Sequence, residues 1–329
     1  MKAWVVKQWC EPHEMQFEEL PAPEPGLGQV RVKVEAAALN FLDTLIIKGQ
    51  YQVKPPFPFT PGVEVAGTVE AVGAGSRFKP GMRVCGNIQT GGYATHAVLP
   101  DASVEPIPDN LSFAEGSALP IVYPTAHQCL KDAGRLQPGE TVLVHAGAGG
   151  VGLAAIQLAR AWGAGKILAT AGGATKLKVC LDAGADAAFD YTGVGNEDAW
   201  VNQVKEATGG KGADIIIDMV GGKIAEQSLR VLNWRGRFIV VGFAGGTIPN
   251  LPANRLLLKA ASAIGVFWGE CSKREPKTAQ AVFQDLFALL ASGKIKPVVT
   301  NTYKLSNAPQ AMIDLATRKT WGKVVLVPD

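Results

Sequence analysis

The sequence has few of the features that mark secreted, membrane-spanning or nucleic-acid-binding proteins. Its 329 residues include only five cysteines, which are scattered along the chain, so we expect no disulfide framework. No apolar run approaches the ~20 residues of a membrane span. The first residues predict a short strand and no signal peptide. A net charge of +3 is too small to indicate a nucleic-acid or membrane partner. We therefore expect a cytoplasmic protein that acts on a small molecule.

Residues at metal-ligand or proton-transfer spacing are also scarce. Cys10 and His13 form a C-x-x-H pair, but no second pair follows at the spacing of a zinc site. The chain has no Tyr-x-x-x-Lys pair of the short-chain dehydrogenase type. We therefore expect no metal ion, and the proton donor of any reaction is not evident.

Glycine, by contrast, is abundant, with 38 residues, and one cluster stands in an informative context. Thr141–His145 predicts a short buried strand, and the stretch from Leu153 predicts a helix. Between them, Gly147, Gly149 and Gly152 match G-x-G-x-x-G, the fingerprint of a dinucleotide-binding turn. A glycine-rich turn of an ordinary α/β domain is the alternative, and the strand–turn–helix context argues against it.

The next strand, 166–170, bears on which dinucleotide binds. An acidic side chain about 20 residues beyond the first glycine would accept a hydrogen bond from the ribose 2′-hydroxyl of NAD. Here no acidic residue occurs between Gly152 and Asp182, and Lys176 follows the strand instead. A cation without a competing carboxylate suits a 2′-phosphate, so we expect NADPH over NADH. A solvated helix lysine is the alternative for Lys176.

The order of the predicted elements indicates an α/β protein with two domains. Alternating strands and helices predict a doubly wound, parallel, six-stranded sheet. Short strands separated by Gly and Pro precede it, and they predict a β-rich domain that the C-terminal elements complete. We expect a dinucleotide-binding domain at 124–267, inserted into a catalytic domain of residues 1–123 plus 268–329. The six predicted strands are Thr141–Ala146, Lys166–Thr170, Ala187–Asp190, Ala213–Met219, Arg237–Gly242 and Ser262–Phe267.

Several short motifs occur together in an informative order. They are Ala-Leu-Asn40-Phe-Leu-Asp43, Gly49-Gln-Tyr51, Pro61-Gly-Val-Glu64, Gly91-Gly-Tyr-Ala, Tyr123-Pro-Thr125-Ala, Ala146-Gly-Ala-Gly-Gly-Val-Gly152, Asp218-Met-Val-Gly-Gly and Val241-Gly-Phe243. In this order the chain resembles, over its whole length, the zinc-free, quinone-oxidoreductase-like branch of the medium-chain dehydrogenase/reductase superfamily. The resemblance implies a Rossmann domain inserted in a GroES-like catalytic domain.

The same resemblance bears on zinc. Zinc alcohol dehydrogenases of the superfamily carry a Cys where this chain has Asn40 and a His where it has Val63. They also carry a four-cysteine lobe, which this chain lacks. Glu64 remains, and we expect it to be structural. No three-ligand catalytic site is left, so the resemblance implies a zinc-independent enzyme.

The resemblance also implies cofactor contacts that spacing alone does not. Lys176, Tyr191 and Arg318 match positions that hold the 2′-phosphate in this family, and Thr125, Phe243 and Phe267 are expected to flank the nicotinamide. The full expected cofactor set is Asn40, Thr125, Gly147, Gly149, Gly150, Val151, Gly152, Lys176, Tyr191, Phe243, Phe267 and Arg318.

By resemblance the activity is hydride transfer from NADPH to a quinone, with Asn40 and Tyr51 as catalytic residues. Asn40 would contact the substrate oxygen or the nicotinamide ribose, although a helix N-cap is an equal alternative for it. Leu45 stands where the family often has a second Tyr, so the substrate remains open. An enone, enal or enoyl-CoA reductase is the nearest rival, and a non-catalytic NADPH-binding protein is a more distant one. The family also implies a homodimer through the edge strand Ser262–Phe267.

Overall fold

A computed structural model of the chain describes residues 1–193 and 198–329. The chain divides into two compact units. Unit 1 combines Met1–Ile121 with Pro297–Asp329, and unit 2 is the continuous segment Val122–Lys296. Unit 2 is thus an insertion in the sequence of unit 1.

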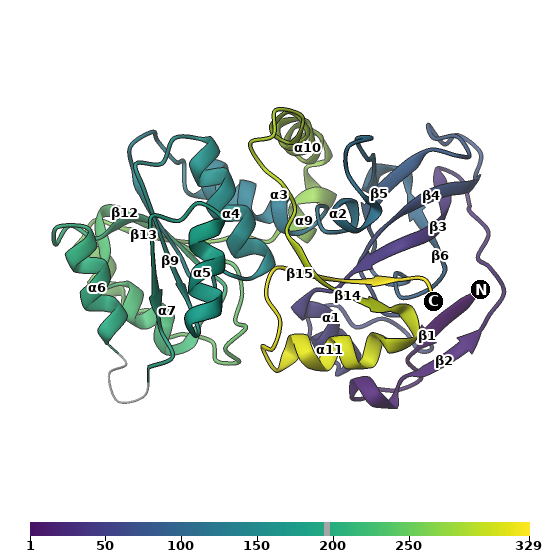
Figure 1. Cartoon of the computed structure of the whole chain (residues 1–329), viewed down its shortest axis with the longest axis horizontal. Coiled ribbons are helices and arrows are strands. Elements are labelled where there is room, and N and C mark those ends of the chain that lie inside the picture. The colour runs from purple at the N-terminus through teal and green to yellow at the C-terminus, as the bar shows by residue number, and fades with distance from the viewer. Residues whose placement is uncertain (194–197) are drawn as a thin grey trace. The chain divides into compact units, whose positions relative to one another are not determined.

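Unit 2 is built on the predicted six-stranded parallel sheet (Figure 1). The strand order is β10-β9-β8-β11-β12-β13, and every neighbouring pair is parallel. This is the order of a dinucleotide-binding Rossmann sheet, with its reversal at β8. The predicted fold class is therefore confirmed. The strands are β8 (Thr141–Val144), β9 (Lys166–Ala171), β10 (Ala187–Asp190), β11 (Ala213–Asp218), β12 (Leu232–Val240) and β13 (Ser262–Gly265).

Helices connect these strands and cover the sheet, with α4 and α5 on the same side in Figure 1. The central strands are apolar on both faces, as parallel strands between helices require. Helix α4 buries its apolar residues, including Leu153, Ile156 and Leu158, and ends near Gly163. The helices of unit 2 are α3 (Val122–His127), the π-helix η3 (Gln128–Ala133), α4 (Gly150–Ala161), α5 (Ala174–Asp182), α6 (Ala199–Ala207), α7 (Gly222–Ser228), α8 (Ala253–Leu257), α9 (Trp268–Arg274) and α10 (Pro276–Ala291).

Unit 1 is the predicted β-rich domain. Its main sheet has the order β14-β15-β3-β4-β5-β7, with β6 also paired to β3, and only the β14–β15 pair is parallel. A separate hairpin joins β1 and β2. The strands are β1 (Lys2–Val5), β2 (Gln16–Glu19), β3 (Gln29–Ala38), β4 (Glu64–Val72), β5 (Arg83–Asn87), β6 (His96–Pro100), β7 (Val104–Pro106), β14 (Val299–Lys304) and β15 (Lys323–Val327).

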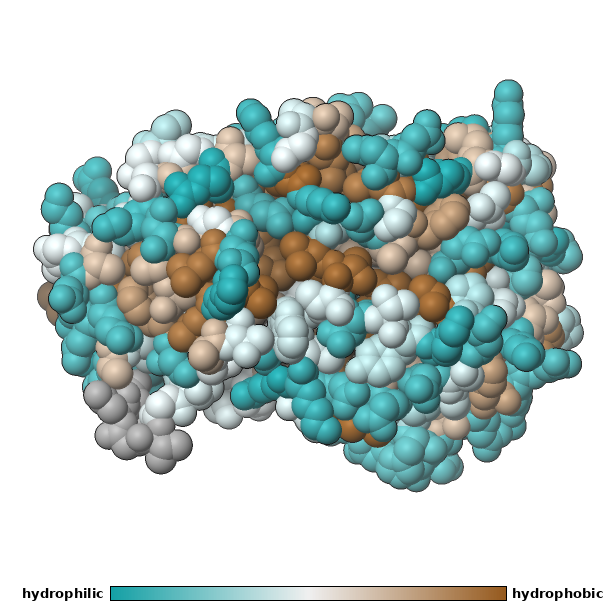
Figure 2. All heavy atoms as spheres, viewed as in Figure 1, coloured by the Kyte–Doolittle hydropathy of each residue, from teal (hydrophilic) through white to brown (hydrophobic). Residues whose placement is uncertain are grey.

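The core of unit 1 follows from strand alternation. In β3 the side chains of Val30, Val32 and Val34 are buried, and those between them are more exposed. The face of unit 1 that Figure 2 shows carries both hydrophilic and hydrophobic residues. Helices α1 (Phe41–Ile47), α2 (Phe113–Ser117) and α11 (Ala308–Ala316) belong to this unit, with short 3-10 turns η1 (Pro12–Glu14), η2 (Asp101–Ser103) and η4 (Leu305–Asn307). Among the described residues, no helix is long and apolar enough to cross a membrane.

The division between the units differs from the predicted domains by two residues at the first boundary, 122–123, and by a longer segment at the second. The sequence prediction placed 268–329 with the β-rich domain, but residues 268–296 fall in unit 2. The reason is packing: α10 lies against α3 and α9 and buries Val282, Leu286 and Leu290. His127 on α3 also contacts Asp285 on α10, with 3.1 Å between Nε2 and Oδ2. Only the elements from Pro297 onward complete unit 1.

Candidate functional site

The glycine loop, Ala146–Gly152, lies between β8 and α4. Gly147 N–H donates to the Thr170 carbonyl at 2.9 Å, which ties the loop to the end of β9. A Cβ at Gly152 would lie 2.4 Å from the Ala146 carbonyl oxygen, and one at Gly147 would lie 2.9 Å from the Ala169 Cβ and the Cys180 Sγ. Both positions therefore require glycine because the loop, the strand and the helix approach one another too closely for a side chain.

The loop leads directly into the N-terminus of α4, where Gly149 is the N-cap. The first amides of a helix have no partner within the helix, and the helix dipole is positive at this end. With no side chain at Gly149, Gly150 or Gly152, an anion can approach these N–H groups closely. The cradle therefore fits the pyrophosphate of a dinucleotide.

The ends of β9 and β10 meet beside this loop. Lys176 lies in the first turn of α5 and is half-buried. Tyr191 follows β10, and its N–H donates to the Ala171 carbonyl at 3.4 Å, so the structure brings both residues to the ends of neighbouring strands. No carboxylate follows β9 directly. The side chain of Asp190, at the end of β10, nevertheless lies at the turn after β9, where it accepts a hydrogen bond from Gly173 N–H at 3.0 Å.

Asp190 is a carboxylate that sequence spacing did not reveal at this position. Its other oxygen accepts from the backbone N–H of Thr192 at 2.7 Å and from the Thr192 hydroxyl at 2.5 Å. Partial burial works to raise its pKa, but the hydrogen bonds from Thr192 and Gly173 hold it below the usual value. Asp190 thus orders the turn, and both its oxygens are already engaged within the chain.

The remaining predicted cofactor residues of unit 2 are Thr125, which lies in α3, and Phe243 and Phe267, which each follow a strand. Thr125 is buried in α3, with 7% of its surface exposed. Phe243 follows β12 and Phe267 follows β13, and both are exposed. Because the carboxyl ends of parallel strands share one edge of the sheet, both phenylalanines belong to the edge that carries the glycine loop.

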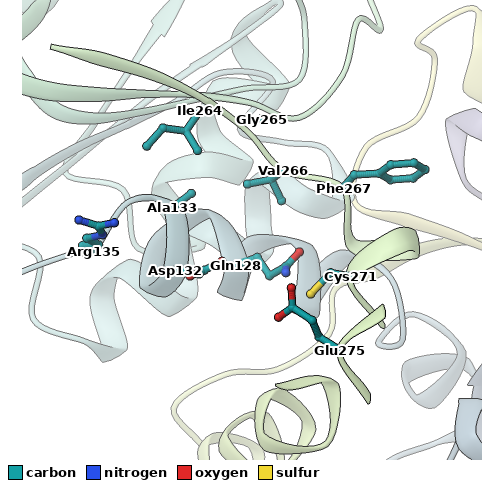
Figure 3. A pocket seen from close by; sticks show the side chains of 10 residues that line it. All are labelled: Gln128, Asp132, Ala133, Arg135, Ile264, Gly265, Val266, Phe267, Cys271 and Glu275. Carbon is teal, nitrogen blue, oxygen red and sulfur yellow. The ribbon is translucent and has the colours of Figure 1, made fainter. Parts of the chain in front are cut away.

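A cavity of about 300 Å³ lies along β13 and η3. Figure 3 shows the Cys271 thiol and the Glu275 carboxylate turned toward the Gln128 amide, while the ring of Phe267 points away from them. Phe267 is the one predicted site residue in its lining. The cavity therefore does not coincide with the predicted nicotinamide environment.

A neutral network underlies the glycine loop. His145 is fully buried, and its Nδ1 lies 2.7 Å from the Thr170 hydroxyl, while its Nε2 lies 2.8 Å from the Ser228 hydroxyl. Ser228 donates its own proton to the Ile224 carbonyl, so it accepts from Nε2–H. Burial lowers the pKa of His145 to about 3. The imidazole is therefore neutral at pH 7 and joins β8, β9 and α7.

Unit 1 holds a charged cluster, which we define as Asn40, Asp43, Glu64, Tyr93 and Lys323. The Lys323 Nζ lies 2.8 Å from Glu64 Oε2, 2.8 Å from Asn40 Oδ1 and 2.9 Å from the Leu39 carbonyl oxygen. The Asn40 Nδ2 also donates to Glu64 Oε2, at 2.8 Å. Lys323 is 4% exposed and Glu64 is fully buried. Burial makes such charges costly to leave unpaired, so these contacts fix all three side chains.

Asp43 extends the cluster toward Tyr93 and Tyr51. Its Oδ2 accepts from Asn40 N–H at 2.8 Å and from the Tyr93 hydroxyl at 3.0 Å, whereas Oδ1 is buried without a partner among the described residues. Burial raises the pKa of Asp43 to about 7, against the lowering effect of these hydrogen bonds and of Lys323. Tyr51 is half-buried, and burial and then the charge of Asp43 raise its pKa.

These contacts bear on the alternatives for Asn40 and on the structural role expected of Glu64. Asn40 occupies the N-cap position of α1 in a capping box with Asp43, and its side chain also contacts Glu64 and Lys323. Glu64 also accepts from Ile121 N–H at 2.8 Å, so it ties several segments of unit 1 together. Arg318, the third expected phosphate ligand, lies in unit 1 after α11 and is exposed, at a φ of 61°.

No group of three or more His, Cys, Asp or Glu side chains in residues 1–193 and 198–329 is arranged to hold a metal ion. At the position of Asn40 and Glu64, the cation that the chain itself provides is the Lys323 ammonium.

Comparison with known proteins extends these observations. Two family models match: an alcohol dehydrogenase GroES-like domain over residues 26–109, and a zinc-binding dehydrogenase over residues 150–288. The quinone oxidoreductase-like protein 2 homolog of Nematostella vectensis is 40% identical over 306 residues, which cover 92% of this chain and 82% of that protein. The quinone oxidoreductase of Rattus norvegicus is 38% identical and covers 99% of this chain and 98% of its own. The chain belongs to the quinone oxidoreductase family of medium-chain dehydrogenases/reductases.

The likeness of this family member to solved structures is equally extensive. The Escherichia coli quinone oxidoreductase, solved in complex with NADPH, superposes with a TM-score of 0.91 at 31% identity, and the match covers 100% of both chains. The predicted family and fold are thereby confirmed. The individual site residues stay predictions.

Sequence reasoning missed the residues that orient Asn40. Lys323 lies 283 positions beyond Asn40, at the start of an otherwise apolar strand, and nothing local marks it as a partner. Asp43 carried one usable signal, since an acidic residue three positions after an N-cap accepts the N-cap amide hydrogen. Tyr93 of this quinone oxidoreductase-family chain carried none beyond its place in the Gly91-Gly-Tyr-Ala motif.

Proposed function

We propose that this protein is an NADPH-dependent reductase of quinones that works without zinc. The observation that carries the cofactor assignment is the turn after β9. It has glycines and the half-buried Lys176 where an NAD-binding chain would carry an acidic side chain, with Tyr191 at the neighbouring strand end. The names of the relatives support the quinone substrate.

In this proposal some residues bind the cofactor, and others orient the nicotinamide and the substrate. The glycine loop and the first amides of α4 would hold the pyrophosphate, and Lys176, Tyr191 and Arg318 would hold the 2′-phosphate. When bound, NADPH supplies the hydride. Thr125, Phe243 and Phe267 would confine the nicotinamide. Asn40 and Tyr51 would donate hydrogen bonds to the substrate oxygen, and the weakly basic oxyanion of a reduced quinone would take its proton from water.

NADPH oxidation followed at 340 nm tests this function. The acceptors are 1,4-benzoquinone, 9,10-phenanthrenequinone, an enone, a 2-enal and an enoyl-CoA, each repeated with NADH. We expect turnover of the quinones with NADPH preferred. Turnover confined to enones, enals or enoyl-CoA would move the function to double-bond reduction. NADPH binding without turnover of any acceptor would indicate a non-catalytic binding protein.

A Lys176→Ala variant tests the phosphate site. Loss of one charge-assisted hydrogen bond, worth about 1.5–3 kcal/mol, should raise the KM for NADPH at least about tenfold and leave that for NADH nearly unchanged. Lys178→Ala is the matched control, because Lys178 lies on the same helix but is exposed and pairs with Asp182 at 2.7 Å. An unchanged ratio of the two KM values in Lys176→Ala would refute the assignment.

We also propose that the protein forms a homodimer through β13. This strand ends the sheet and pairs only with β12 among the described residues, and Ser262, Ala263 and Gly265 are exposed. Leu257 and Leu258, just before it, are 79% and 74% exposed, which is unusual for leucine. Light scattering should give twice the mass of one chain; a monomeric mass would rule the dimer out.

The cytoplasm is the location that we propose. All five cysteines are free thiols, three of them buried, as expected of a chain that folds in a reducing compartment. Fractionation of expressing cells should recover the protein with cytoplasmic markers, and recovery with a membrane or secreted fraction would contradict the proposal.

A further inference from the structure

Lys323 is a buried cation that the proposed reaction does not yet use. Its ammonium has three hydrogens and lies within 2.9 Å of three acceptors, namely the Leu39 carbonyl, Asn40 Oδ1 and Glu64 Oε2. Every donor position is therefore filled from within unit 1. A buried ammonium is stable only with such partners, so the geometry around it is strongly determined.

This geometry determines which face of the Asn40 amide a ligand can meet. Oδ1 is taken by the ammonium, and Nδ2 donates to Glu64 Oε2 at 2.8 Å. The reverse orientation would set NH₂ against the ammonium and oxygen against the carboxylate, so the assignment of the two atoms is unambiguous. The second Nδ2 hydrogen has only the Ala38 carbonyl at 3.5 Å, a long contact. The orientation of the amide is thus fixed, and the second Nδ2 hydrogen is the group that Asn40 can donate to a ligand.

We propose that Lys323 is a positioning residue that makes Asn40 an obligatory hydrogen-bond donor, and that the group Asn40 meets is a carbonyl oxygen of the substrate. This rests on the proposed function. An oxidised quinone or an enone has such an acceptor oxygen, and hydride addition places negative charge on it. A fixed N–H then binds the reduced oxygen more strongly than the starting carbonyl, which favours reduction.

A double-mutant cycle tests the coupling between the two residues. Asn40→Ala should lower kcat/KM for 1,4-benzoquinone about 10- to 100-fold, as expected for one buried hydrogen bond to developing charge. Lys323→Met should lower it by a similar factor. In the double variant, Lys323→Met should add no further loss, because there is no amide left to orient. Losses that multiply, or a Lys323→Met variant with native kcat/KM, would overturn the proposal.

Two further variants separate positioning from folding. Lys323→Met leaves Glu64 buried without its cation, so Lys323→Met with Glu64→Gln removes both charges and spares the fold. Its kcat/KM should stay low although its unfolding temperature recovers. Lys323→Arg keeps a donor for Asn40 Oδ1 and should restore most of the activity. Native activity in the neutral pair would contradict the proposal.

A readout without turnover keeps this inference distinct from the proposed function. The side-chain NH₂ signals of Asn40 in a ¹⁵N spectrum, assigned by their loss in Asn40→Ala, should move in Lys323→Met. The NADPH affinity should stay native, since in this proposal the Asn40 amide contacts the substrate carbonyl and not the cofactor. If no acceptor is turned over, the proposed function fails while the spectrum still tests Lys323. Unmoved Asn40 signals would overturn the inference by themselves.

Discussion

The glycine loop of unit 2 and the charged cluster of unit 1 are built in opposite ways. The glycine loop is seven consecutive residues that pack too closely for side chains at Gly147 and Gly152, and the His145 network beneath it is neutral. The residues of the charged cluster come from α1, β4, β15 and the segment between β5 and β6 that carries Tyr93, and they include a buried ion pair. Steric limits therefore determine the first region, whereas electrostatic balance determines the second. Each region should fail under a different kind of substitution.

The largest expected effect is the loss of charge balance in unit 1. Glu64→Gln leaves Lys323 buried without its carboxylate and should lower the free energy of unfolding by about 3–5 kcal/mol. The control is Asp182→Asn, which breaks the exposed Lys178–Asp182 pair and should cost about 0.5 kcal/mol or less. Chemical denaturation measures both. If the two variants lost the same free energy of unfolding, the burial of the Glu64–Lys323 pair would not make its loss more destabilising than that of an exposed pair.

A steric substitution should instead break unit 2. Gly152→Ala places a Cβ 2.4 Å from the Ala146 carbonyl oxygen, so we expect a loss of about 1–3 kcal/mol in unfolding free energy and a large loss of NADPH affinity. At Gly149 the nearest atom would be 3.2 Å away, and Gly149→Ala should cost less than about 1 kcal/mol. A Gly152→Ala variant that is as stable as Gly149→Ala would show that the loop tolerates side chains.

Acid should weaken unit 2 through His145. Its pKa is about 3 in the folded chain and about 6.5 when unfolded, so its contribution is complete above pH 6.5 and is lost as the pH falls toward 3. Between pH 6.5 and 5 the free energy of unfolding falls by about 1.5 kcal/mol. Because the buried Asp218, with a pKa of about 6, opposes this slope, the effect is measured as the difference between wild type and His145→Gln. A pH-independent difference would contradict a buried neutral imidazole.

Asp43 should give unit 1 the opposite dependence. Its pKa rises from 3.8 to about 7 on folding, so the folded chain holds the proton more tightly and stability falls as the pH rises through this window. Asp43→Asn has no charge to bury. Its free energy of unfolding should therefore rise by about 1.4 kcal/mol relative to that of wild type between pH 5 and pH 6. If the free energy of unfolding of the variant instead fell relative to wild type over that interval, the carboxylate would be stabilised in its ionised form.

The same contrast explains what could be predicted from the sequence. Gly147 and Gly152 are close in the chain, and their spacing carries the geometry of the strand–turn–helix unit, so the cofactor fold was predictable. The six strands were located for the same reason, because periodicity is local. The segment 268–296 was assigned to the wrong side of the unit boundary because nothing local in an amphipathic helix identifies the surface it covers.

Of the charged cluster, by contrast, the sequence predicted roles only for Asn40 and Glu64, and for Asn40 it left cap and site as equal alternatives. The structure adds Lys323 as a partner of the Asn40 side chain, and its distance along the chain carries no signal without the fold. Asp190 gives a similar lesson in unit 2. The turn after β9 has no acidic residue of its own, yet a neighbouring strand brings a carboxylate to it.

The position of β15 in the sequence also bears on the order in which the two units can fold during translation. Unit 2 is one continuous segment and is complete once residue 296 has left the ribosome, whereas the sheet of unit 1 needs β15, which lies between β14 and β3 near the end of the chain. During translation residues 1–121 must wait for β15 to be made, and until then Glu64 lacks its partner Lys323. Unit 2 can therefore fold before unit 1, although residues 1–121 are made before it.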